Sequence, residues 1–133
     1  MRREKVTVRR QRIKTKLAPA AIGPYSQAIL AGDTLYCSGQ IAIDPATGHM
    51  VTDSVEIEAE RVLDNLGAVL RAAGMDFRHV VRCTVYLADI NDYAQVNEIY
   101  SRYFSDDAPA REAVQVAALP RGARVEISCV AVR

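Results

Sequence analysis

Histidine and cysteine, the residues that most often build metal centres and disulfide frameworks, are few in this chain. The two histidines, His49 and His79, lie far apart in the sequence, so we do not expect a His-based metal site. The three cysteines, Cys37, Cys83 and Cys129, are odd in number, widely spaced and each set in an apolar, strand-like stretch. This spacing argues against a disulfide framework and against a zinc site, and it predicts three buried thiols in a reducing cytosol.

Long hydrophobic runs are also missing. No apolar stretch approaches the ~18 residues that a membrane span needs. The N-terminus lacks the apolar segment of a secretory signal. We therefore expect a cytoplasmic protein with no membrane partner. The chain has 133 residues, 50% of them hydrophobic and 25% charged, which predicts one ordinary globular domain with its own core.

The charge is unevenly distributed along the chain. Residues 1–16 carry eight of the seventeen Lys and Arg residues, with Glu4 as their only acid, and the remainder has a net charge of −6. A basic segment of this kind could contact nucleic acid or an anionic surface. We favour a solvated segment or an edge strand, because part of it has β character and lysine protects exposed edges. A mitochondrial presequence is a weaker alternative, since serine and a clear apolar face are missing. We assign residues 1–11 to a basic N-terminal arm and residues 12–133 to a single domain.

Turn residues and hydrophobic periodicity predict the element order β-β-β-α-β-α-β-β. The expected strands are 12–16, 25–31, 34–38, 79–87, 113–118 and 124–132, and the expected helices begin at Asp53 and at Asn91 or Asp92. Gly32-Asp33 is a two-residue hairpin signal. Glu56 is expected to complete a capping box with Asp53, and Gly74 to end that helix. The order implies a mixed sheet with both helices on one face, so the other face needs cover, most simply from a partner subunit.

An arginine and a glutamate stand in nearly charge-free, strand-like stretches near the C-terminus. Apolar residues on both sides of Glu126 predict a strand covered on both faces. An unpaired carboxylate there would cost several kcal/mol, and Arg111, one hairpin away, is the expected partner in a shared pocket. From spacing alone, a structural ion pair is the commoner outcome for such a pair.

Several dispersed motifs, all in the same order, resemble the RidA (YjgF, UK114-like) family, and the match covers about residues 12–132. The motifs are Ala18-Pro19-Ala20-Ala21-Ile22-Gly23-Pro24-Tyr25-Ser26-Gln27-Ala28, Ser38-Gly39-Gln40-Ile41, Asp44-Pro45-Ala46-Thr47-Gly48, Leu63-Asp64-Asn65-Leu66 with Ala72-Ala73-Gly74, Asn91-Asp92-Tyr93-Ala94-Gln95-Val96-Asn97, and Pro109-Ala110-Arg111 with Val125-Glu126-Ile127.

The resemblance implies an α+β, chorismate-mutase-like fold with a six-stranded mixed sheet and two helices on one face. Family members are homotrimers whose sheets pack into a central barrel, with clefts between subunits. Members that resemble RidA itself hydrolyse reactive enamines and imines, such as 2-aminoacrylate and 2-aminocrotonate, to 2-keto acids and ammonia. The resemblance implies no cofactor and no metal.

The resemblance also implies roles for three residues. Arg111 matches the arginine that binds the substrate carboxylate, a task suited to the parallel donors of a guanidinium. Glu126 matches the residue that orients the attacking water. Burial raises the pKa of such a carboxyl and a nearby arginine lowers it, so proton exchange near neutral pH is feasible. Tyr25 matches the tyrosine that lines the cleft and takes part in catalysis, although a packed turn aromatic is the alternative.

Four further positions match residues around the same cleft. Asn97 matches a polar helix residue facing the pocket, and Ser38 and Gly39 a strand end whose backbone a small ligand can approach. Ala113 stands where many members have a cysteine. Thiol chemistry is therefore excluded at this position, but the Ala113 backbone can still contact a ligand. Glu112 adds a negative charge, and strand alternation predicts that it points away from Arg111.

Two other functions stay open. The first is a trimer that binds keto or amino acids in the same cleft without turnover. The second, which ranks lower, is RNA binding or ribonuclease activity. Its only local support is the basic arm, because no interleaving of aromatic and basic residues and no metal cluster accompany it.

Overall fold

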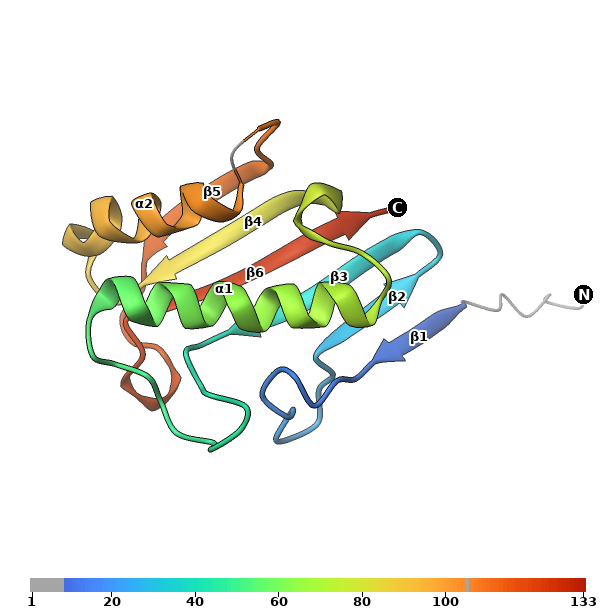
Figure 1. Ribbon diagram of the computed structural model, residues 1–133, viewed down its shortest axis with the longest axis horizontal. Helices are drawn as coiled ribbons and strands as arrows, with labels where there is room; N and C mark the ends of the chain where they lie inside the picture. Colours follow the sequence, from blue (N-terminus) through green and yellow to red (C-terminus); the bar gives the residue numbers. More distant parts are fainter. Residues whose placement is uncertain (1–8, 105) are drawn as a thin grey trace, which may run out of the picture.

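Six strands form one mixed sheet in the order β1-β2-β3-β6-β4-β5 (Figure 1). The computed structural model describes residues 9–104 and 106–133. The strands are β1 (Arg10–Ile13), β2 (Ala28–Ala31), β3 (Thr34–Gln40), β4 (Val80–Leu87), β5 (Ala110–Gln115) and β6 (Val125–Val132). β4 and β5 run parallel, and the other neighbouring strands are antiparallel. Figure 1 shows α1 (Val55–Ala72) and α2 (Tyr93–Tyr103) on the same face of the sheet, which confirms the predicted α+β fold.

The predicted order of elements is confirmed, but several strands differ in extent. Gly32, with a φ of 61°, occupies the turn between β2 and β3 as the hairpin signal predicted. β2 begins later than predicted because the buried Gln27 side chain holds the preceding loop. Its Nε2 donates to the carbonyl of Pro19 at 2.8 Å and to that of Thr15 at 3.0 Å. β1 and β5 begin two and three residues earlier than predicted, because pairing with β2 and β4 sets their limits.

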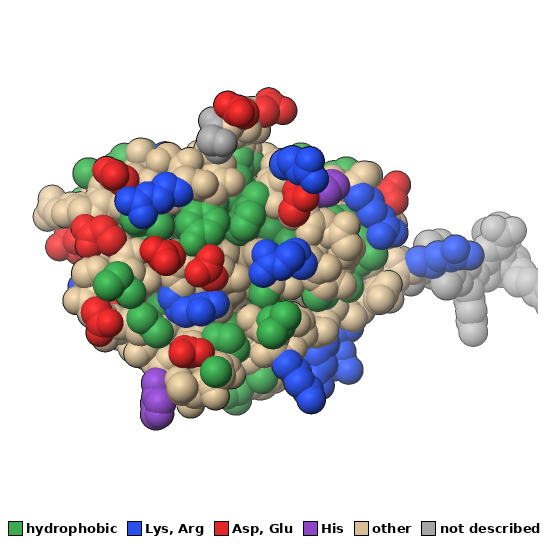
Figure 2. Space-filling view, viewed as in Figure 1, with side chains coloured by type: hydrophobic (Ala, Val, Ile, Leu, Met, Phe, Trp, Pro, Cys, Tyr) green, Lys and Arg blue, Asp and Glu red, His purple; other side chains and the backbone are tan. Residues whose placement is uncertain are grey.

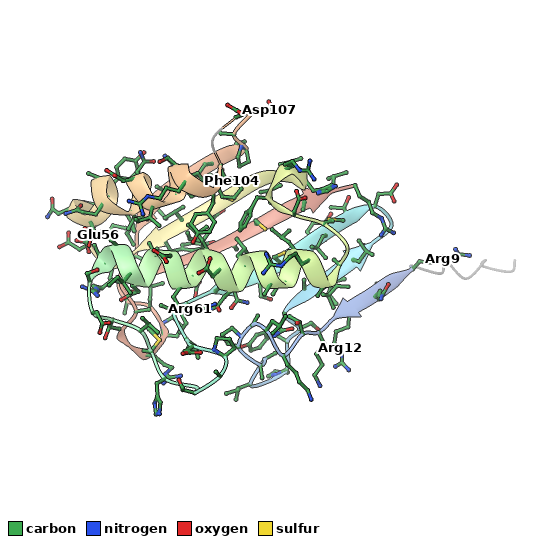
Figure 3. All side chains as sticks on the ribbon, viewed as in Figure 1. Arg9, Arg12, Glu56, Arg61, Phe104 and Asp107 are labelled. Carbon is green, nitrogen blue, oxygen red and sulfur yellow. The ribbon has the colours of Figure 1, made fainter. Side chains whose placement is uncertain are left out.

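The predicted basic arm, residues 1–11, lies mostly outside the described residues, since the description begins at Arg9. Arg10 and Gln11 belong to β1, which pairs with β2 at the edge of the sheet. Figure 3 places the labelled Arg9 and Arg12 at this edge. In Figure 2, basic side chains gather here, whereas acidic side chains gather over the N-terminal part of α1.

The N-terminus of α1 corrects the predicted capping box. Ser54, not Asp53, is the N-cap: its backbone is extended (φ −149°, ψ 163°) and its Oγ accepts from the Ile57 amide at 3.1 Å. The helix therefore starts one residue later than expected, and Glu56 falls too early in the first turn to close the box. The predicted end is confirmed, because Gly74 has a φ of 74°, which a side chain would strain.

A short 3₁₀ turn, Ile90–Asp92, leads into α2. Its cap is Asp89, whose carboxylate accepts from the Asn91 amide at 2.9 Å. The prediction that Asn91 or Asp92 caps the second helix is confirmed in position only: Asp92 is the N-cap residue of α2, but its side chain makes no capping hydrogen bond. The turn leads directly into Tyr93, the first residue of α2, whose hydroxyl contacts Arg111 of β5.

The helix face of the sheet packs against both helices to form the core. Its fully buried side chains include Leu35, Leu63, Leu66, Leu70, Leu87, Val125 and Ile127. Burying each such side chain stabilises the fold by about 1.5–3 kcal/mol. Phe104, at the end of α2 (Figure 3), packs with ring centroids 4.6 Å from Tyr100 and 5.1 Å from Phe77. These contacts hold α2 against the rest of the domain.

A fully buried glutamate fixes the start of β6, a feature that the sequence did not reveal. Glu58 of α1 is 0% exposed, and its carboxylate accepts from the backbone amides of Arg124 (2.6 Å) and Val125 (3.2 Å). The Arg124 guanidinium adds an ion pair at 3.0 Å. Arg124 immediately precedes β6 and Val125 is its first residue. The Glu58 carboxylate therefore positions the start of the strand that carries Glu126.

The opposite face of the sheet carries no helix. Along β6, residues 125, 127, 129 and 131 are buried, whereas Glu126 and its same-face neighbours are half-buried or exposed. The prediction that this strand is covered on both faces is therefore wrong within one chain, because both helices lie on one side. Three large apolar side chains are 40% or more exposed on the uncovered face: Tyr36, Val114 and Val132. Within the described residues, neither helix is long and apolar enough to span a membrane.

Candidate functional site

The predicted site residues fall into two clusters on opposite faces of the sheet. Arg111 is in register with Cys83, which is in register with Cys129, so all three face the helices. Glu126 is in register with Tyr86 and faces the other side. The expectation that Arg111 and Glu126 share a pocket is therefore wrong within one chain. β4 separates their strands, and alternation turns their side chains apart.

Arg111 is held in place under α2. Its Nη1 donates to Asn97 Oδ1 at 2.7 Å and its Nη2 donates to the Tyr93 hydroxyl at 2.6 Å. Its Cζ lies 4.7 Å from the centroid of the Tyr100 ring, within cation–π range. The structure thus brings together Arg111 and Asn97, as predicted, and fixes both terminal nitrogens of the guanidinium. The Nε–H and the second proton of each terminal nitrogen are left for a ligand.

The floor of this cluster stays uncharged at neutral pH. Tyr100 is 5% exposed, and burial raises the pKa of its phenol well above the usual range, with the adjacent Cys83 thiol adding to the effect. Burial likewise raises the pKa of the Cys83 thiol to about 11. In the described part of the chain, the Tyr100 hydroxyl has no hydrogen-bond partner of standard geometry. Arg111 therefore carries the charge of the cluster.

Glu126 lines a pocket of about 330 Å³ together with two other predicted site residues, Tyr25 and Gly39. The other lining residues are Pro19, Ala20, Ile22, Gln27, Gln40, Ile41, Ile43, Pro120 and Arg121. Burial raises the pKa of the Glu126 carboxyl. A half-buried carboxyl in a mostly apolar pocket can take up and release a proton closer to neutral pH than an exposed one.

Gly39 has no side chain, which leaves room for the Glu126 carboxylate beside β3. A β-bulge lies between Cys37 and Gln40, where β3 pairs with β6. A Cβ placed on Gly39 would lie 2.8 Å from Glu126 Cδ and Oε2, closer than van der Waals contact permits. A side chain at position 39 would therefore displace the Glu126 carboxylate.

Ser38 and Tyr25 line another pocket, of about 520 Å³, and Tyr25 also lines the Glu126 pocket. The Ser38 hydroxyl donates to the Ser26 carbonyl at 2.6 Å, so it ties the loop that carries Tyr25 to β3. Tyr25 is 55% exposed, and its amide donates to the Gly23 carbonyl at 2.9 Å. Ser38 is thus engaged inside the chain, whereas the Tyr25 ring is available to a ligand.

β5 places Ala113 and Glu112 on opposite sides. Ala113 is half-buried on the same face as Arg111. Glu112 points to the other face, where its carboxylate accepts from Arg82 at 2.6 Å and from the Thr84 hydroxyl at 3.3 Å. The Arg82 hydrogen bond lowers the pKa of the Glu112 carboxyl. The expectation that Glu112 points away from Arg111 is confirmed.

Two residues at these clusters were not predicted from the sequence. Apolar periodicity puts Tyr93 on the apolar side of the second helix, yet its hydroxyl contacts Arg111. The available signal was its spacing of four residues from Asn97, which puts both on one helix face. Arg121 lines the Glu126 pocket with a φ of 57°, a backbone conformation that only tertiary packing selects for a non-glycine residue.

The described residues offer no group of three His, Cys, Asp or Glu side chains placed to hold a metal. What they define is a small α+β protein with a guanidinium fixed under one helix and a carboxyl in a pocket on the uncovered sheet face. The chain belongs to the family described as "Endoribonuclease L-PSP", which matches residues 15–133 and is the RidA (YjgF) family. The predicted resemblance is confirmed.

Known proteins of this kind match almost the whole chain. A Bos taurus protein named 2-iminobutanoate/2-iminopropanoate deaminase is 56% identical over 124 residues, covering 93% of this chain and 90% of the relative. The crystal structure of RidA from the Antarctic bacterium Psychrobacter sp. PAMC 21119 has a TM-score of 0.89 at 44% identity, covering 92% of this chain and 99% of that one. E. coli TdcF, solved with bound serine, has a TM-score of 0.89 at 40% identity, covering 92% and 98%.

Proposed function

We propose that this protein hydrolyses reactive 2-imino acids and their enamine tautomers, of the 2-aminoacrylate or 2-aminocrotonate type, to 2-keto acids and ammonia. The observation that carries the proposal is the Arg111 guanidinium, which Asn97 and Tyr93 hold while three of its N–H groups stay available. A carboxylate is the ligand that such a fork binds best. The name of the Bos taurus relative supports the same chemistry.

The reaction needs a water at the C=N carbon and proton transfers to the departing nitrogen. Arg111 binds the substrate carboxylate. In the imine form, Glu126 accepts a proton from the attacking water and returns it to the nitrogen, which gives the neutral tetrahedral carbinolamine. Glu126 then takes the proton of the carbinolamine hydroxyl and passes it to the amino group, so that the C–N bond breaks as the C=O bond forms and ammonia and the keto acid leave. The raised pKa of Glu126 suits both directions of this transfer.

The separation of the two clusters supports a site completed by a second copy of the chain. Within one chain, Arg111 and Glu126 face opposite sides of the sheet, so one substrate cannot contact both. We propose a homotrimer in which Arg111 of one subunit meets Glu126 of another in an inter-subunit cleft. The exposed Tyr36, Val114 and Val132 on the uncovered face support such packing.

The remaining predicted residues have supporting roles in this proposal. Tyr25 covers the substrate, the Gly39 and Ala113 backbones border it, and Asn97 orients Arg111. Ser38 acts through the loop that carries Tyr25, since its hydroxyl is bound to Ser26. The catalytic cycle uses no cofactor. A cytoplasmic location is supported by the three free cysteines, which suit a reducing compartment.

A coupled assay tests the activity. A threonine or serine dehydratase generates the imine, and keto-acid release is followed with and without the protein. We expect the wild type to accelerate release and Arg111→Ala to abolish acceleration while the oligomer stays intact. A wild-type protein without acceleration overturns the proposal.

The second candidate is a trimer that binds amino or keto acids without turnover, and the serine bound to TdcF favours it. Calorimetric titration with 2-oxobutanoate or serine separates the two functions. Binding by the wild type without any acceleration in the coupled assay would support this second candidate.

A further inference from the structure

We propose that the Tyr93 hydroxyl is a substrate-binding group, which donates its proton to the carboxylate that Arg111 binds. The inference rests on the proposed role of Arg111 and adds a residue that apolar periodicity assigns to the core side of α2. Tyr93 then defines a three-point carboxylate site with the two free terminal N–H groups of the guanidinium.

The hydrogen bond between Tyr93 and Arg111 has a fixed direction. A guanidinium only donates, so at 2.6 Å the Tyr93 oxygen must be the acceptor. A phenol has one proton and two lone pairs, so its proton is still available. Among residues 9–104 and 106–133, no carbonyl or carboxylate accepts it. Because the neighbouring cation polarises the phenol, its O–H is a better donor than that of an isolated tyrosine.

The three tyrosines of α2 differ in what their hydroxyls can do. Tyr103 donates to Asp64 Oδ1 at 2.8 Å, so its proton is already used. Tyr100 is 5% exposed and lies beneath Arg111, which its ring contacts. Tyr93 is 39% exposed and stands at the first residue of α2, so a ligand on Arg111 can reach its oxygen. Of these three, Tyr93 alone combines access with a proton to donate.

Tyr93 and Asn97 also determine how the guanidinium faces its ligand. They take one N–H from each terminal nitrogen, and the Tyr100 ring restricts tilting. The remaining donors, together with the phenol, match the lone pairs of a carboxylate. A neutral amide in its place has one oxygen fewer to accept these donors. Tyr93 therefore selects for a free carboxylate and contributes to ground-state binding of the substrate.

The test compares Tyr93→Phe with Tyr103→Phe, two substitutions on one helix that each remove a single hydroxyl and keep the ring. Calorimetry measures the Kd of 2-oxobutanoate and of its neutral analogue 2-oxobutanamide, and the coupled assay measures KM and kcat. We expect Tyr93→Phe to raise the keto-acid Kd and the KM about tenfold, the loss of one hydrogen bond to a charged group. The Kd of the amide and the kcat should change little, and Tyr103→Phe should match the wild type.

Two results for the Tyr93→Phe variant overturn the inference. One is a keto-acid Kd within twofold of the wild type. The other is an equal loss of affinity for keto acid and amide, which would indicate a structural role only. Keto-acid binding that survives Arg111→Ala also overturns it, since Arg111 would not be the carboxylate ligand. Because calorimetry needs no turnover, a wild type that binds but does not hydrolyse would refute the proposed function and leave the role of Tyr93 supported.

Discussion

Gly39 lies directly against the Glu126 carboxylate: a Cβ at position 39 would be 2.8 Å from Glu126 Cδ. The backbone of β3 therefore limits where this carboxyl can stand. Because the clash falls on the end of a flexible side chain, the glutamate can move aside without disrupting the sheet. The consequence is a change in the position of the carboxylate more than a change in stability.

Gly39→Ala should reduce kcat at least tenfold while the melting temperature falls by only a few degrees, because Glu126 is displaced from its place in the pocket. Steady-state assays and thermal melts measure the two effects. Gly74→Ala is the matched control. Gly74 has a φ of 74°, and apart from its own neighbours along the chain no atom of the described residues lies within 4 Å of the point that an alanine methyl group would occupy. That variant should therefore lose about 1 kcal/mol of stability and keep its kcat.

Glu126→Gln should abolish most turnover and change the pH dependence of stability. Burial raises the pKa of the native carboxyl above its ordinary value of 4.5, so the native state binds the proton more tightly than the unfolded state. The free energy of unfolding therefore falls as pH rises from the Glu126 pKa of the unfolded state to that of the native state, and it stays lower at higher pH. Glutamine does not ionise, so the variant avoids this loss of stability.

We expect the Glu126→Gln variant to melt above the wild type at pH 8 and at the same temperature at pH 4, with kcat reduced about 100-fold or more. The exposed Glu98→Gln is the control and should change neither quantity. A stabilisation that is equal at both pH values would contradict the linkage.

Arg111→Lys keeps the charge but loses the planar fork that Asn97 and Tyr93 orient. We expect KM to rise at least tenfold, since an ammonium cannot hold both contacts and still bind a carboxylate through two parallel bonds. Arg78→Lys is the comparison, because Arg78 is 87% exposed and pairs only with Asp76 in the described residues. Activity of Arg111→Lys close to the wild type would show that charge alone suffices.

Val114→Asp places a charge on the uncovered sheet face, where Val114 is 42% exposed. We expect the wild type to sediment as a trimer and this variant as a monomer that has lost turnover, because in the proposed trimer the two clusters meet only between subunits. Ile57→Asp, at a residue of α1 that is 44% exposed, is the control and should sediment and turn over as the wild type does. An active monomeric variant would contradict a site shared between subunits.

Glu58→Ala should be the most destabilising of these substitutions, at about 3–5 kcal/mol in urea unfolding. It removes the acceptor of two backbone amides at the start of β6 and leaves the Arg124 guanidinium without its carboxylate. Glu98→Ala, whose ion pair with Arg102 is exposed and 3.7 Å long, should change stability by less than about 0.5 kcal/mol.

Local patterns in the sequence determined the elements and the direction of single side chains. The hairpin at Gly32 and the helix end at Gly74 were predictable because positive φ is a local requirement that glycine meets. Glu112 was predictable because strand alternation has a period of two. The family was also recognisable from the sequence, because several of its motifs occur in the same order along this chain.

Only the tertiary structure decided which of these side chains meet. β4 pairs with both β5 and β6, so Arg111 and Glu126, which the sequence predicted to be one hairpin apart, come to lie on separated strands and opposite faces. The approach of Gly39 to Glu126 likewise depends on a bulge in a long-range pairing. Sequence periodicity fixes the face of a residue within its own element. The order in which distant elements pair is a property of the whole core, and it decides the neighbours.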